Sequence, residues 1–97
     1  MIKLMEICEL INASNSFKQK FTLREIYINP KHVVSLREET NYQQKLIEGE
    51  LPRNLDDRQQ FTRLVINRGQ TGLEVVVIGS PDVVYEKIKG GKRVLKG

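Results

Sequence analysis

The sequence predicts an α+β domain: a mainly antiparallel sheet of about five strands with one C-terminal helix packed on it. Two observations in residues 64–90 support this. Two β-branched runs flank a glycine-containing turn at residues 67–72, a pattern typical of a β-hairpin. The second run, residues 73–78, leads directly into the start of a helix. We expect the rest of the chain to pair with this unit or to pack on it.

The N-terminal part of the chain predicts three strands. Residues 2–11 favour a strand, although the spacing of their apolar residues also fits a short helix. Residues 21–28 alternate in polarity as a strand does, and Asn29 with Pro30 ends that strand. Residues 33–37 predict the next strand. A tight reversal at residues 29–32 would make these two strands an antiparallel hairpin.

Residues 38–60 predict a long polar loop. They contain Gly49 and Pro52, and their four apolar residues are too sparse for a long amphipathic helix. A connection of this length in a small domain is usually functional or disordered. Two interpretations therefore stay open: a binding loop or arm that contacts a partner, and an insertion between neighbouring strands.

The C-terminal helix has a clear start. Ser80 is a good N-cap, Pro81 suits the first helical position, and Asp82 lies where the helix dipole favours a negative charge. Val84 and Ile88 lie one turn apart and form the face that covers the sheet. Two consecutive glycines then predict the helix end at residue 90. The expected organisation is one β-rich domain over residues 1–90, followed by a basic tail at 91–97.

Size and charge fit a small soluble protein. The chain has 97 residues and a net charge of +4, with 39% hydrophobic and 29% charged residues. The last eleven residues hold five basic residues and no acidic one, so the remaining chain is close to neutral. Such a tail could contact nucleic acid or an acidic protein, or it could be a solvated terminus. No apolar run approaches the ~20 residues of a membrane span, and no export signal is visible, so we expect a cytoplasmic protein without membrane association.

The residues that usually carry catalysis are few. Cys8 is the only cysteine and His32 the only histidine, so neither a disulfide nor a zinc site is expected. No positional signature links the two as a nucleophile and its base. The glycines of residues 68–72 lack the Lys-Ser/Thr pair of a phosphate-binding loop. We therefore expect no enzyme, no cofactor and no catalytic residues.

Arginines and aromatic residues in the long loop, in the hairpin turn and in the tail are the candidates for contact with a partner, because they can bind anions or stack. These candidates are Tyr42, Arg53, Arg58, Arg68, Lys92 and Arg93.

The layout resembles a family of very small flagellar and swarming-motility proteins, and similarly built uncharacterised proteins of bacteria and phages. The resemblance lies in three segments: Tyr27-Ile28-Asn29-Pro30 followed by Val33-Val34-Ser35-Leu36; Asn67-Arg68-Gly69; and Val77-Ile78-Gly79-Ser80-Pro81 leading to Val84-Tyr85-Glu86-Lys87-Ile88. The resemblance implies a non-enzymatic protein and brings no catalytic residues. The N-terminal segment, residues 38–60 and the basic tail differ from the family pattern.

Together these features predict a small non-catalytic binding protein that regulates or inhibits a protein partner, as a phage or bacterial accessory protein would. The alternative is a nucleic-acid or nucleotide binding protein that uses the basic tail and loop arginines. Salt dependence separates the two, because binding led by phosphate contacts weakens steeply as salt rises. Self-association into a homo-oligomer is compatible with either.

Overall fold

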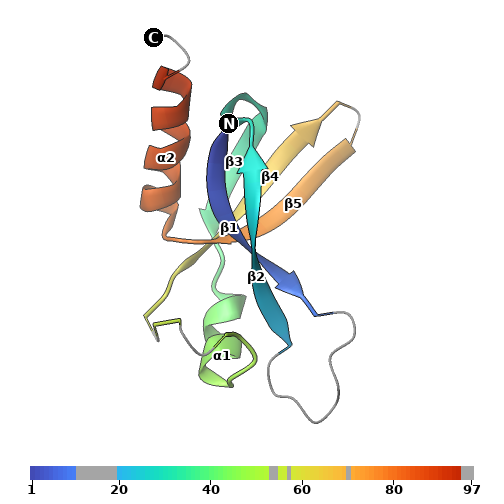
Figure 1. The fold of residues 1–97 in the computed structure, drawn as a ribbon, viewed down its shortest axis with the longest axis vertical. Helices are drawn as coiled ribbons and strands as arrows, with labels where there is room; N and C mark the ends of the chain where they lie inside the picture. The colour runs from blue at the N-terminus through green and yellow to red at the C-terminus, as the bar shows by residue number, and fades with distance from the viewer. Residues whose placement is uncertain (11–19, 53–54, 57, 70, 95–97) are drawn as a thin grey trace.

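The computed structural model describes residues 1–10, 20–52, 55–56, 58–69 and 71–94. Within these ranges the chain forms an antiparallel sheet with two α-helices and one 3-10 turn (Figure 1). The elements are β1 (Ile2–Glu9), β2 (Phe21–Ile28), η1 (Pro30–His32), β3 (Val33–Glu38), α1 (Asn41–Ile47), β4 (Phe61–Arg68), β5 (Thr71–Ile78) and α2 (Pro81–Val94). The predicted α+β class, the five strands and the C-terminal helix on the sheet are confirmed.

The strand order is β2-β1-β5-β4-β3, and all neighbours are antiparallel. Strands β2 and β3 therefore lie at opposite edges, and the expected hairpin between them is wrong. The Asn29 side chain accepts a hydrogen bond from the Lys31 backbone N–H at 3.0 Å and starts η1, and β3 then pairs with β4. The chain turns a corner here instead of reversing within one ladder.

The short link between the two edge strands requires a curled sheet. Two extended steps and three 3-10 residues span only about 13 Å between β2 and β3. Four strand spacings in a flat sheet would cover about 19 Å. The sheet therefore curls until β2 approaches β3 at the η1 end, and β1 and β2 lie in front of β3, β4 and β5 in Figure 1.

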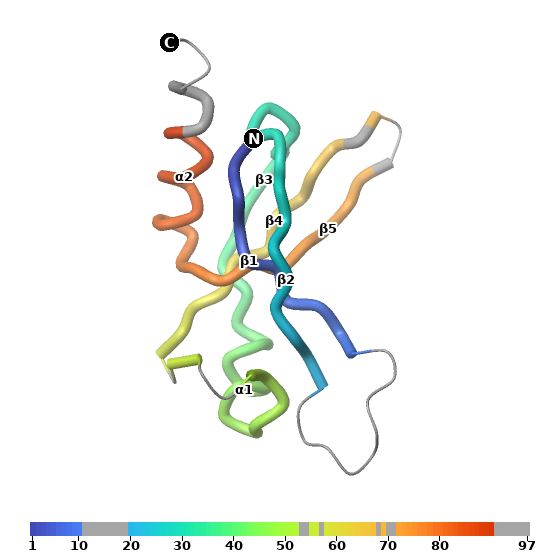
Figure 2. Tube along the Cα trace, viewed as in Figure 1, coloured from blue at the N-terminus to red at the C-terminus, as the bar shows by residue number. Residues whose placement is uncertain are grey.

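Each face of the curled sheet has its own core. Helix α2 covers the first, where Val84 and Ile88 pack on Leu4, Leu64 and Val77, and all five are at least 95% buried. The second core contains Ile7, Leu51, Phe61 and Val76 and lies on the α1 side. Figure 2 shows α1 and α2 separated along the length of the molecule. The alternation of a strand explains how β5 serves both cores, with Val77 on one face and Val76 on the other.

Residues 38–60 differ from the predicted polar loop. Glu38 ends β3, residues 41–47 form α1, and Leu51 is only 2% exposed. Tyr42 and Leu46, one helical turn apart, pack against the second core together with Leu55. The apolar residues of this segment are too sparse for a long helix, but they suffice to anchor a short helix and the segment after it. They do so because they bury the second face of the sheet.

The predicted helix end at residue 90 is also wrong, because α2 continues through both glycines to Val94. Gly90 is not among the glycines with positive φ. A glycine costs a helix about 1 kcal/mol relative to alanine, and each added residue gains one hydrogen bond. The boundary between a domain at 1–90 and a tail at 91–97 therefore does not correspond to the end of a structural element. Residues 95–97 lie outside the described part of the chain.

Gly79 connects the sheet to α2 and needs its glycine. Its φ is 122°, and an added Cβ would lie 3.3 Å from Cγ2 of Val84. Its carbonyl accepts a hydrogen bond from the buried Thr62 hydroxyl at 2.8 Å, and its N–H donates to the Gln60 carbonyl at 2.9 Å. These contacts set the direction in which α2 leaves β5. No helix among the described residues has both the length and the apolar character needed to cross a membrane.

Candidate functional site

A hollow of about 490 Å³ opens along the edge of β2. We call it the β2-edge hollow. Ile26 and Ile28, which face the first core, line this hollow. Tyr27 lines it as well, although its side chain points to the other face of the sheet. A space touched by three consecutive strand residues lies beside the strand and not over one face. It is lined by Met1, Ile26, Tyr27, Ile28, Asn29, His32, Ile66, Gly69 and Leu73.

The β2-edge hollow combines a buried apolar floor with exposed apolar walls. Ile28 and Ile66 are 4% and 7% exposed, so they belong to the core. Tyr27 is 60% exposed and Leu73 39% exposed, although both are large and apolar over most of their surface. Small-molecule and peptide sites have this composition, a largely apolar concavity with a few polar groups at its rim. The volume lies in the range of about 300–1,000 Å³ that is usual for ligand sites.

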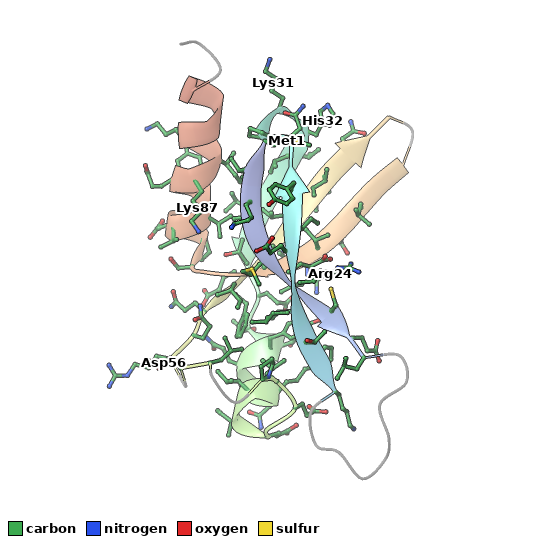
Figure 3. The ribbon with its side chains drawn as sticks, in the orientation of Figure 1. Met1, Arg24, Lys31, His32, Asp56 and Lys87 are labelled. Carbon is green, nitrogen blue, oxygen red and sulfur yellow. The ribbon has the colours of Figure 1, made fainter. Side chains whose placement is uncertain are left out.

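The hollow lies at the same end of the molecule as a lysine. Its lining contains His32 and no acidic residue. Lys31 precedes His32 in η1, is exposed, and makes no ion pair with any described residue. Figure 3 shows Lys31, His32 and Met1 at the same end of the molecule. Farther along β2, the cation Arg24 is paired with Glu6 at 3.2 Å, so it differs from Lys31 in already having a charged partner.

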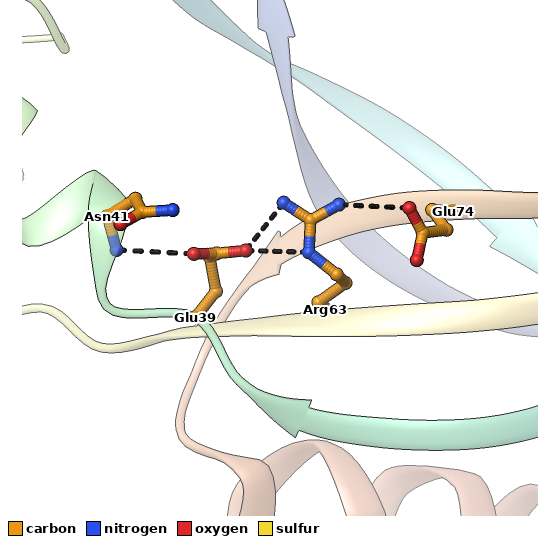
Figure 4. A network of polar contacts seen from close by, with 4 residues as sticks. All are labelled: Glu39, Asn41, Arg63 and Glu74. Carbon is orange, nitrogen blue, oxygen red and sulfur yellow. Dashed lines mark hydrogen bonds and ion pairs between the residues drawn. The ribbon is translucent and has the colours of Figure 1, made fainter.

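A second polar site is structural. Glu39 is 7% exposed, and its Oε2 accepts a hydrogen bond from Nε of Arg63 at 2.6 Å (Figure 4). Its Oε1 accepts the Asn41 backbone N–H at 3.2 Å, at the first turn of α1. Nη1 of Arg63 also reaches Oε2 of Glu74 at 3.4 Å. The network thus ties the end of β3 and the start of α1 to β4 and β5.

The same network sets the ionisation of Glu39. Burial alone would raise the pKa of this carboxyl group. The hydrogen bonds from Arg63 and from the Asn41 backbone, with the charges of Arg63 and Arg37, outweigh burial and hold the pKa below its usual value. Glu39 is therefore a charged residue that stabilises the fold, and a general base at neutral pH would need a higher pKa.

A shallower second hollow of about 470 Å³ lies where α2 begins. Arg58 and Lys87 line it together with Asp56. Asp56 is engaged with the backbone, because its Oδ1 accepts the Arg58 N–H at 2.8 Å. Oγ of Ser80 accepts the Val83 N–H at 3.3 Å, as predicted for an N-cap. The helix start is therefore occupied by its own cap.

Of the residues predicted to contact a partner, those that the structure describes are spread over separate elements. Tyr42 packs inside the second core, with ring centroids 5.4 Å from Phe21 and 5.9 Å from Phe61. Arg58 is exposed at the second hollow, and Arg68 ends β4 at the tip of the β4–β5 hairpin. Lys92 and Arg93 lie in the last helical turn of α2. Arg53 lies outside the described residues.

The sulfur and the imidazole that could form a catalytic pair are kept apart. Cys8 pairs with Thr22 near one end of the β1–β2 ladder, whereas His32 follows the other end. Burial, with the charge of Glu6, raises the pKa of the Cys8 thiol, which lowers its thiolate fraction and its reactivity. Among the described residues, no group of three or more His, Cys, Asp or Glu side chains is placed to hold a metal ion.

Sequence reasoning missed the β2-edge hollow, although its residues carried a signal. Alternation along residues 21–28 places Tyr27 on the face opposite Ile26 and Ile28. Leu73 begins the apolar run of residues 73–78, and nothing in that run marks it as more exposed than its neighbours. Only the curl of the sheet brings the β4–β5 hairpin beside β2 and leaves Leu73 at an open edge.

Comparisons with protein-family models, with curated proteins and with solved structures found no match.

Proposed function

We propose that this chain is a small non-catalytic binding protein that regulates or inhibits a protein partner through the β2-edge hollow. The observation that carries the proposal is the exposure of Tyr27 and Leu73 around an apolar concavity. Contiguous exposed apolar surface of this kind marks interaction sites more often than scattered single residues do. A role as a phage or bacterial accessory protein in the cytoplasm belongs to the same proposal.

The chemistry of the described side chains supports binding over catalysis. Burial raises the pKa of the Cys8 thiol, which disfavours the thiolate, and Cys8 lies far along the β1–β2 ladder from His32. Glu39, the most buried carboxylate, is neutralised by Arg63. Glu39 is thus committed to structure, whereas Tyr27 and Leu73 beside the hollow leave 60% and 39% of their surface exposed.

The test compares capture of proteins from the native host's lysate by three tagged forms of the chain, each analysed by mass spectrometry. Leu73→Asp places a charge in the β2-edge hollow. Ile47→Asp is the matched control, because Ile47 is 73% exposed on α1, away from the hollow. We expect a protein that the parent and Ile47→Asp retain and that Leu73→Asp loses. A partner set that Leu73→Asp leaves unchanged would rule out the hollow as the binding site.

One observation favours the alternative, a nucleic-acid or nucleotide binder. Helix α2 extends past Gly90, so Lys87, Lys89, Lys92 and Arg93 belong to one continuous helix. A helix with this charge can follow a phosphate backbone. A variant with both Lys92→Glu and Arg93→Glu should then weaken binding to a fluorescent single-stranded oligonucleotide, and the parent's affinity should fall steeply between 50 and 200 mM salt. Binding that is absent in low salt would exclude this alternative.

A further inference from the structure

The outer edge of β2 offers unpaired backbone groups. The Leu10 N–H donates to the Lys20 carbonyl at 2.8 Å, so Lys20 and the even-numbered residues of β2 are bonded to β1. The Phe21 N–H donates outward to the Glu50 carbonyl at 3.1 Å, as does the Lys20 N–H at 2.7 Å, so Glu50 covers the start of this edge. By the alternation of an antiparallel ladder, Leu23, Glu25 and Tyr27 also direct their N–H and C=O groups outward. These groups have no backbone partner among the described residues.

The opposite edge of the sheet is less suited to pairing. Strand β3 has a register shift between Val33 and Ser35, and bulges of this kind blunt an edge. The β2 ladder runs in regular register over all eight residues and has no such shift. Edge strands that are regular and uncovered are the ones that accept an added strand. The β2-edge hollow lies directly beside this stretch, next to Tyr27.

We propose that the partner contributes an extended segment that adds as a strand to the edge of β2 at Leu23–Tyr27. This rests on the proposed function and names how the partner is held. One apolar side chain of the segment enters the β2-edge hollow against Ile66 and Leu73, and a carboxylate of the segment lies near Lys31. Backbone pairing supplies affinity that does not depend on sequence, the hollow selects an apolar side chain, and Lys31 at the same end of the molecule selects a carboxylate.

A second copy of this chain is a poorer occupant of the same edge. The symmetric register that uses the whole free stretch is centred on Glu25, and it places two Glu25 carboxylates directly opposite each other. Like charges in that position destabilise a ladder. A foreign segment with its own sequence avoids this repulsion, so the observations favour a different partner.

The test uses the full chain and synthetic ten-residue peptides, selected from a random display library against the folded protein. Amide hydrogen exchange is then followed by NMR with and without the best peptide. We expect Glu25 and Tyr27 to gain protection, while Arg24 and Ile26, which already bond to β1, stay unchanged. Selected peptides should combine alternating apolar residues with at least one acidic residue. Protection confined to other elements, or failure to select any peptide, would overturn the proposal.

Two pairs of variants sharpen the result. Tyr27→Pro removes an outward N–H, which an edge strand tolerates, whereas Tyr27→Thr keeps that donor and removes the ring. We expect peptide affinity to fall at least about tenfold further in Tyr27→Pro than in Tyr27→Thr, since a lost backbone hydrogen bond leaves a peptide carbonyl unpaired. Lys31→Glu should weaken acidic peptides, and Lys89→Glu, on the exposed side of α2, should not. Equal affinities within each pair would contradict strand addition.

The proposed function and this inference can fail separately. If a lysate partner is lost with Leu73→Asp but retained by Tyr27→Pro, the hollow binds a partner and strand addition is wrong. If no partner is lost with Leu73→Asp, the proposed function itself fails.

Discussion

Val77 provides the sharpest test of the fold, because it lies at the centre of the first core. It is fully buried, packs in the cluster that contains Val84 and Ile88, and is paired with Thr62 on β4 and with Glu6 on β1. Val77→Asp therefore removes an apolar side chain and adds a carboxyl group at a site that already has a neighbouring carboxylate. No described cation lies opposite it in the ladder.

The expected loss of stability has two parts. Removing the buried valine side chain costs about 1.5–3 kcal/mol. The new carboxyl group must stay neutral at pH 7, and raising its pKa by about three units or more costs at least about 4 kcal/mol. A loss of roughly 5–7 kcal/mol is comparable with the whole stability of a small domain, so we expect Val77→Asp to be largely unfolded.

The assay is urea unfolding at 25 °C, followed by circular dichroism, for the parent and three variants. Val77→Ala should lose about 2 kcal/mol, from two buried carbon atoms and the cavity they leave. Val34→Asp is the matched control, because the same substitution falls on a strand residue that is 63% exposed, and it should stay within about 0.5 kcal/mol of the parent. If Val77→Asp unfolds at the same urea concentration as Val34→Asp, β5 does not form the centre of the core and this account of the fold fails.

Three further predictions follow from other contacts. Glu39→Gln should destabilise the domain by about 1–3 kcal/mol in urea unfolding at pH 7, because it weakens the charged hydrogen bond with Arg63; an unchanged midpoint would show that the pair adds nothing. Burial would raise the pKa of Glu39, but its bonds to Arg63 lower it below the usual value. The stabilisation that Glu39 gives is therefore complete above the pKa of an unfolded glutamate, about 4.3, and is lost as the pH falls through the pKa of the folded state. The stability of the parent should then fall more steeply below about pH 4.3 than that of Glu39→Gln. Gly79→Ala should lower the melting temperature, because its φ of 122° and the approach to Val84 do not suit a side chain, whereas Gly72→Ala, with open space around the added Cβ, should melt near the parent; equal melting temperatures would contradict the strain at Gly79.

The candidate site could be predicted from the sequence only in fragments. Arginines such as Arg58 and Arg68 have side chains that can bind a partner, but residue type alone does not predict which residues lie close together in space. The structure places these two on different elements. Tyr42 resembles an exposed contact residue because its neighbours are polar. It is drawn into the second core because the sheet face carrying Phe61 needs a cover.

The sequence by itself determined the elements whose signals are local. The β4–β5 hairpin, the Ser80 cap and the face of α2 with Val84 and Ile88 depend on turn chemistry, capping and helical spacing within a few residues of each position. The other strands were predicted from alternation or from β-branched runs within each segment, although residues 2–11 also fitted a short helix.

Only the tertiary structure decided the features that depend on distant partners. Strands β2 and β3 are neighbours in sequence yet form opposite edges, because β1 closes on β5 and β3 pairs with β4. Helix α1 forms because a second apolar face of the sheet is available to bury Tyr42 and Leu46. The β2-edge hollow exists because a short link forces the sheet to curl, and no pattern within one strand records that curvature.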